Sequence, residues 1–160
     1  MRYVGIDPGT NESAPGGIAY IDDDGSYGSV SMPRDTVEIC REIRKVVNGY
    51  ESVAAIERQW ARPRDGRSSL FKLATNYGEI LGVLAALDVD VVMVTPAQWK
   101  KDLSLASDGS SKENSLAMAR ALFPNVSLKY KKNHGIAEAL LIAKWVMTNS
   151  RIDLRTTIQK

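Results

Sequence analysis

The chain has only one cysteine and one histidine among its 160 residues, and it has no long apolar run. The single cysteine, Cys40, excludes an internal disulfide, and a single histidine excludes zinc-finger spacing. No apolar stretch approaches the ~20 residues that cross a bilayer, and Met1-Arg2-Tyr3 leads into a strand pattern without a signal-peptide hydrophobic region. We therefore expect a cytosolic protein with no membrane partner.

What is present is the composition of a globular protein, with 44% hydrophobic and 25% charged residues. The length predicts one domain, residues 1–149, followed by a polar tail, residues 150–160. Charge is uneven: residues 1–57 hold five Lys/Arg and ten Asp/Glu, and residues 58–160 hold sixteen and nine. Carboxylates beside a basic surface are typical of a metal-dependent nuclease, and a scatter of surface charges is the alternative.

The first candidate site residue is Asp7, at the end of a short apolar run that begins at Arg2. The run suits a buried central strand, and Pro8-Gly9 is expected to stop its pairing, which leaves Asp7 where the strand exits the core. A carboxylate in such a place is suited to bind a metal ion. An Asx-type turn residue is the simpler alternative.

Further strands are predicted along the chain at residues 16–21, 27–32, 52–56 and 90–95. The first three strands should form an antiparallel meander, and the last two should be parallel, giving a five-stranded mixed α/β sheet flanked by helices. Glu57 ends its strand as Asp7 ends the first one. Because parallel strands end at the same rim of a sheet, both acids should lie at that rim.

Two helices are predicted to cover this sheet early in the chain. One follows Asp35, and its expected apolar face comprises Val37, Cys40, Ile43, Val46 and Val47. The other runs from Ser69 to Leu87, and its apolar stripe predicts core or a dimer face.

Glu138 stands out because it lies within the apolar helical segment 137–146. A carboxylate there is costly unless it is paired or bound to metal, so a buried ion pair is the alternative to a ligand role. His134 lies four residues earlier on nearly the same helix face, so both side chains can point at one site. A lone histidine is otherwise often incidental.

The segment after Glu57 combines arginines with a tryptophan, and these are Arg58, Trp60, Arg62, Arg64 and Arg67. Aromatic and arginine side chains together stack on bases and bind phosphates, so we predict a substrate-contacting loop. Solvated arginines are the alternative.

With the acids in this order, the chain resembles the RuvC-type Holliday junction resolvases of the RNase H-like superfamily, particularly phage and prophage relatives, over about residues 2–146. The motifs that carry the resemblance are Gly5-Ile6-Asp7-Pro8-Gly9-Thr10, Ala55-Ile56-Glu57, Thr95-Pro96-Ala97-Gln98-Trp99-Lys100 and the segment from His134 to Ala143.

The resemblance implies an RNase H-like fold and a crossover junction endodeoxyribonuclease in a bacterium or a phage-infected cell. Such an enzyme hydrolyses phosphodiesters with two Mg²⁺ or Mn²⁺ ions and no nucleotide cofactor. Its substrate is branched DNA, a four-way junction that a homodimer cuts by paired symmetrical nicks leaving 5′-phosphate and 3′-hydroxyl ends.

By position, Asp7, Glu57 and Glu138 look like the three acids that hold the cations, and His134 looks like the fourth member of the site. The family often has an aspartate three residues before its last acid, where this chain has Gly135. Either His134 or Asn133 is expected to fill this role, or one metal is held more loosely than usual.

The resemblance also assigns basic and aromatic residues. Lys112 looks like the basic catalytic residue, and Trp60 matches an aromatic that stacks on bases at the junction centre. The expected DNA contacts are Arg58, Trp60, Arg62, Arg64, Arg67, Lys100, Lys101, Lys112, Lys131 and Lys132.

Two other functions remain open from the sequence, and length argues against a third. A related RNase H-like enzyme could cut branched DNA broadly or act on RNA-containing substrates, and a binding protein could keep the fold without cutting. The actin-like ATPases share a similar first strand, but they need two such halves, which 160 residues cannot supply.

Overall fold

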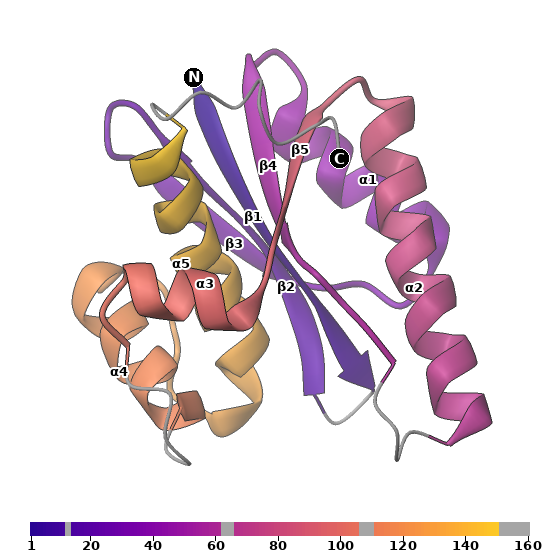
Figure 1. Cartoon of the computed structure of the whole chain (residues 1–160). Helices are drawn as coiled ribbons and strands as arrows, with labels where there is room; N and C mark the ends of the chain where they lie inside the picture. Colours follow the sequence, from indigo (N-terminus) through magenta and orange to yellow (C-terminus); the bar gives the residue numbers. More distant parts are fainter. Residues whose placement is uncertain (12–13, 62–65, 106–110, 151–160) are drawn as a thin grey trace.

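One mixed sheet of five strands forms the centre of the structure, a computed structural model that describes residues 1–11, 14–61, 66–105 and 111–150 (Figure 1). The strands are β1 (Arg2–Asn11), β2 (Ala14–Asp22), β3 (Tyr27–Ser31), β4 (Ser52–Glu57) and β5 (Asp90–Val94). Their order is β3-β2-β1-β4-β5; β1 to β3 pair antiparallel, and β1, β4 and β5 pair parallel. The predicted fold class is confirmed.

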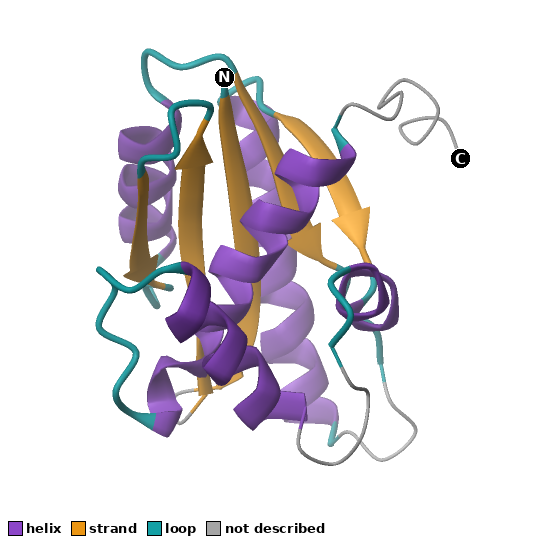
Figure 2. Cartoon of the chain, turned by 90° about the vertical axis from the view of Figure 1, so that its left-hand side faces the viewer, coloured by secondary structure: helices purple, strands orange, loops and turns teal. Residues whose placement is uncertain are grey.

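Helices cover both faces of this sheet (Figure 2). They are α1 (Thr36–Val47), α2 (Arg67–Ala86), α3 (Pro96–Asp102), α4 (Ser111–Leu122) and α5 (His134–Asn149), and a short 3₁₀ turn, Lys131–Asn133, precedes α5. The helices α1 and α2 lie on one face, and α3, α4 and α5 lie on the other (Figure 1). Within the described ranges, no helix is long and apolar enough to cross a membrane.

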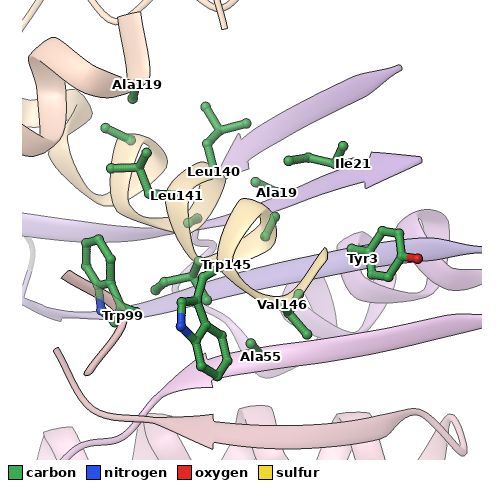
Figure 3. Close-up of a cluster of buried hydrophobic side chains, with 14 of the residues drawn as sticks. Tyr3, Ala19, Ile21, Ala55, Trp99, Ala119, Leu140, Leu141, Trp145 and Val146 are labelled. Atoms are coloured by element: carbon green, nitrogen blue, oxygen red, sulfur yellow. The ribbon is translucent and has the colours of Figure 1, made fainter. Parts of the chain in front are cut away.

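Alternation along β1 separates two hydrophobic cores. Val4 and Ile6 pack on the side of α1 and α2, whereas Tyr3 belongs to the cluster around α5. That second cluster surrounds α5 with apolar side chains from the sheet and from α3 and α4 (Figure 3). At Gly5 an added Cβ would lie 2.0 Å from the Ala139 carbonyl oxygen, so α5 lies directly on β1.

The first strand is longer than predicted. Its pairing with β4 ends at Ile6 and Ile56, but its pairing with β2 continues through Gly9 and Pro15 with a register shift. The expectation that Pro8-Gly9 stops all pairing is wrong, because one side of β1 is already unpaired there and an edge tolerates proline.

The first helix also differs in detail from its predicted apolar face. Asp35 caps it by accepting from the backbone N–H groups of Val37 and Glu38. Val37 is in the first turn and is 56% exposed, whereas Ile39 is fully buried. The buried positions are Ile39, Ile43, Val46 and Val47. The predicted division between the domain and its tail stays a prediction, and residues 151–160 lie outside the described part.

Candidate metal centre

The strand ends place two of the predicted acids at one rim of the sheet. In the parallel pair β1–β4, Ile6 is opposite Ile56, so Asp7 and Glu57 each follow the last paired residue. Asp7 is 7% exposed, and its Oδ1 accepts a hydrogen bond of 3.0 Å from the Gly9 backbone N–H. Gly9 has φ +70°, a conformation that glycine adopts without strain, so the turn after Asp7 depends on it.

The start of α5 brings the other two predicted residues to this rim. Asp7, His134 and Glu138 each offer a ligand atom, and these atoms lie within 4.8 Å of one another. Glu138 is 5% exposed, so the cluster is enclosed rather than a surface group of acids. The spacing of four residues puts His134 and Glu138 on one helix face, as the sequence predicted.

Glu57 lies beside this cluster, but it is not one of the residues whose ligand atoms all lie within 4.8 Å of one another. Its Oε2 accepts a hydrogen bond of 2.9 Å from the indole N–H of Trp99. Burial raises the pKa of Glu57, the charge of Glu138 raises it further, and the Trp99 hydrogen bond opposes both. The acid is therefore close enough to Glu138 for their charges to interact.

The surroundings of Asp7 oppose its ionisation. Burial raises its pKa well above the usual range, and the charges of Glu57 and Glu138 add to the shift. A buried carboxylate that faces two others is stabilised by a bound cation, which reverses the electrostatic cost of ionisation.

Glu138 is the best-compensated of the three acids. Its Oε1 lies 2.8 Å from Lys100 Nζ, 3.2 Å from His134 Nε2 and 3.2 Å from the Ser115 hydroxyl, which donates to it. Burial raises the pKa of Glu138, but His134 and Lys100 outweigh burial and hold the pKa below its usual value. The surroundings of Glu138 thus favour its ionised form.

The histidine provides the observation that tests whether a metal fits. His134 Nε2 is buried, and among the described residues it has no hydrogen-bond partner, although Glu138 Oε1 is 3.2 Å away. A buried imidazole nitrogen that faces carboxylates without a well-formed hydrogen bond belongs to a donor set that a divalent cation can satisfy. The residues present therefore fit the metal that the resemblance implies.

The neighbouring position explains why this chain lacks an aspartate at residue 135. Gly135 lies against β2, and an added Cβ would be 2.1 Å from the Pro15 carbonyl oxygen and 2.7 Å from Gly16 Cα. A side chain at 135 does not fit this backbone. Asn133 is engaged elsewhere, since its Oδ1 accepts from the Tyr130 backbone N–H at 3.0 Å. Of the two alternatives for the fourth ligand, the geometry favours His134.

The remaining predicted site residues are the basic and aromatic ones, which stay predictions. Trp60, three residues after the end of β4, is 49% exposed. Six of the basic residues predicted to contact DNA are described and exposed, namely Arg58, Arg67, Lys101, Lys112, Lys131 and Lys132. Arg62 and Arg64 lie outside the described residues. The lysine that contacts an acid of the cluster is Lys100, predicted only as a DNA contact, and not Lys112.

Sequence reasoning missed three polar contacts of the acids, those of Trp99, Lys100 and Ser115. The contacts of Trp99 and Lys100 had a signal in the sequence, the Thr95-Pro96 start of α3. This helix begins directly after β5, whose last residue, Val94, pairs with Glu57. Ser115 is fully buried on α4, and no local pattern separates it from other helix serines.

Comparisons with known proteins concern the fold and the kind of protein rather than single residues. No family model matches the chain. It is 41% identical over 87 residues to the protein named Holliday junction resolvase MOC1, chloroplastic, of Chlamydomonas reinhardtii. The match covers 53% of this chain and 10% of the relative, so the chain matches only about a tenth of that protein's length.

Solved structures of RuvC from Thermus thermophilus match nearly the whole chain. RuvC in complex with a Holliday junction substrate has a TM-score of 0.65 and 20% identity, covering 96% of this chain and 97% of the other. A second Thermus thermophilus RuvC structure has a TM-score of 0.60, also at 20% identity, covering 95% and 96%. The predicted resemblance is confirmed: the chain has the RNase H-like fold of RuvC, and about half of it is similar in sequence to a Holliday junction resolvase.

Proposed function

We propose that the chain is a metal-dependent endonuclease that resolves four-way DNA junctions by paired symmetrical nicks, leaving 5′-phosphate and 3′-hydroxyl ends. The observation that carries this proposal is the enclosed cluster of Asp7, His134 and Glu138, with Glu57 beside it, on a RuvC-type fold. The similarity to a protein named Holliday junction resolvase supports the choice of substrate.

In this proposal, Asp7, Glu57, Glu138 and His134 hold two Mg²⁺ or Mn²⁺ ions. Bound cations of this kind activate a water and stabilise the leaving oxygen of a phosphodiester. Asp7 and Glu57 supply charge that burial makes costly without a cation, which favours binding. Lys100 offsets part of the negative charge at Glu138 and keeps the carboxylates close together.

A groove beside Glu57 supports DNA as the substrate. It has a volume of about 860 Å³, and its lining includes Arg34, Arg58, Trp60 and Lys72. Cationic side chains bind phosphates, and a half-exposed indole offers a stacking surface for a base. The groove therefore combines the two contacts that a nucleic-acid strand needs next to the acids.

A homodimer follows from symmetrical cutting, because two nicks related by a two-fold axis need two active sites. The proposed interface is α2. Phe71 on this helix is 74% exposed, and an added Cβ at Gly78 or Gly82 would meet open space. Small residues four apart on an exposed apolar face allow close packing of a second helix. Location in the cytosol and a phage or prophage origin stay predictions.

Conservative substitution of the acids tests the proposal. Asp7→Asn, Glu57→Gln and Glu138→Gln should bind branched DNA about as well as the wild type while cutting is abolished. Electrophoretic mobility shifts and nicking assays measure the two properties on the same samples. A variant that loses its fold, seen by circular dichroism, would support a purely structural role for that acid. Preferential cutting of flaps or RNA–DNA hybrids would favour the broader nuclease instead.

A further inference from the structure

The short helix α3 contacts two of the acids through neighbouring residues. Lys100 reaches Glu138, and Trp99 reaches Glu57. The helix starts directly after β5, where Thr95 Oγ1 accepts from the Gln98 backbone N–H and Pro96 occupies the first helical position. This tight junction fixes the direction in which α3 leaves the sheet.

The indole of Trp99 is fully buried. It is packed in the hydrophobic cluster around α5 (Figure 3). The indole N–H is a donor only, and it carries no ionisable charge. It can therefore fix the direction of a carboxylate without competing as a ligand and without adding charge to the site.

We propose that Trp99 is a positioning residue, whose indole N–H holds Oε2 of Glu57 so that the carboxylate is presented to a divalent cation in one orientation. The observations are the 2.9 Å hydrogen bond, the complete burial of the ring and the position of Glu57 just after the last residue of β4 that pairs with β1. Groups that orient a ligand from behind commonly change metal affinity by about 10- to 100-fold. The inference rests on the metal site of the proposed function.

The chain contains a matched control for this role. Trp145 is 5% exposed in the same cluster, and its indole N–H donates to Asp102 Oδ2 at 2.8 Å. Both indoles are thus buried, and both donate to a carboxylate, but only that of Trp99 contacts an acid of the site. Trp99→Phe and Trp145→Phe each remove one indole N–H and keep an aromatic ring.

The test is a Mn²⁺ titration of EDTA-treated protein, followed by thermal unfolding without any DNA. Trp99→Phe should raise the Mn²⁺ concentration for half-maximal stabilisation by about tenfold, and Trp145→Phe should leave it unchanged. In a Glu57→Gln background, Trp99→Phe should add no further change, because the orientation of that carboxylate is already lost. An unchanged titration for Trp99→Phe, an equal change for both variants, or additivity with Glu57→Gln overturns the proposal.

A second measurement uses the unaltered chain and does not depend on a variant that folds. In a ¹⁵N-labelled protein, Mg²⁺ should shift the indole N–H signal of Trp99 and leave that of Trp145 in place. Shifts elsewhere in the cluster with an unmoved Trp99 signal would contradict the positioning role. If Mg²⁺ and Mn²⁺ change nothing in the wild type, the metal site of the proposed function fails, which is a different outcome.

Discussion

Asp7→Asn should stabilise the metal-free protein while removing its response to metal. Asp7 is buried, and its carboxylate lies within 4.8 Å of a ligand atom of Glu138. At an effective dielectric constant of about 20, two unit charges at that separation repel by about 3 kcal/mol. Lys100 and His134 offset part of this repulsion, so we expect the substitution to add about 1–2 kcal/mol to the free energy of unfolding. The amide can still accept from Gly9.

The direction of the pH dependence follows from the raised pKa of Asp7. The folded metal-free protein binds a proton at Asp7 more tightly than the unfolded chain does. The cost of ionised Asp7 is therefore absent below the unfolded pKa, grows as pH rises through the folded pKa, and is complete above it. The gain in the free energy of unfolding from Asp7→Asn should be largest above the folded pKa of Asp7 and should vanish in acid.

Thermal unfolding in EDTA and in Mn²⁺ measures both effects. For a chain of this size, 1–2 kcal/mol corresponds to about 2–8 °C in Tm. In Mn²⁺ at a hundred times its dissociation constant, the wild type should gain about 2.7 kcal/mol, and Asp7→Asn should gain little. The exposed Asp90, at the opposite end of the sheet, provides the control substitution Asp90→Asn. A lower Tm for Asp7→Asn in EDTA, or an equal gain in Mn²⁺, would refute the reasoning.

Three further predictions follow from other contacts. Gly135→Asp should destabilise the fold by about 1–3 kcal/mol or more, because its Cβ would be 2.1 Å from the Pro15 carbonyl oxygen. Chemical denaturation measures this loss, and a variant as stable as the wild type would contradict the prediction. Arg2 pairs with Asp22 through two contacts of 2.7 and 2.8 Å and holds the pKa of that carboxyl below its usual value, so Asp22→Asn should cost about 3 kcal/mol at pH 7. That stability is present above the unfolded pKa and is lost as pH falls through the lowered folded pKa, so denaturation curves of both proteins should converge in acid. Trp60→Ala should reduce cutting of four-way junctions about tenfold and cutting of duplex less, and equal losses in the nicking assay would argue against stacking at the branch.

The sequence predicted the sheet and the position of the acids because both depend on local patterns. Apolar runs that end in a carboxylate fix where Asp7 and Glu57 leave their strands, and an acid in an apolar helix identifies Glu138. The pairing of β1 beyond Asp7 was not predictable from local patterns. It arises because β2 continues to pair with β1 past the point where the pairing with β4 stops, so the proline at position 8 faces an unpaired side of the strand.

The contacts that tune the acids could not be predicted from local patterns. Lys100 and Ser115 approach Glu138 only because α3 and α4 both pack beside α5. In the same way, the absence of an aspartate at Gly135 is explained by the backbone of β2, which is far away in the sequence. Tertiary packing, rather than residue type, decides these roles.

Cleavage of a synthetic mobile four-way junction tests the central claim most directly. The same assay should include a flap, a matched duplex and an RNA–DNA hybrid, with Mg²⁺ or Mn²⁺ and with EDTA as the control. The account predicts paired, symmetrical, metal-dependent nicks that yield ligatable duplexes. Binding of the junction without any cutting in either metal would contradict the account, and preferential cutting of the flap or hybrid would replace junction resolution with the broader nuclease activity.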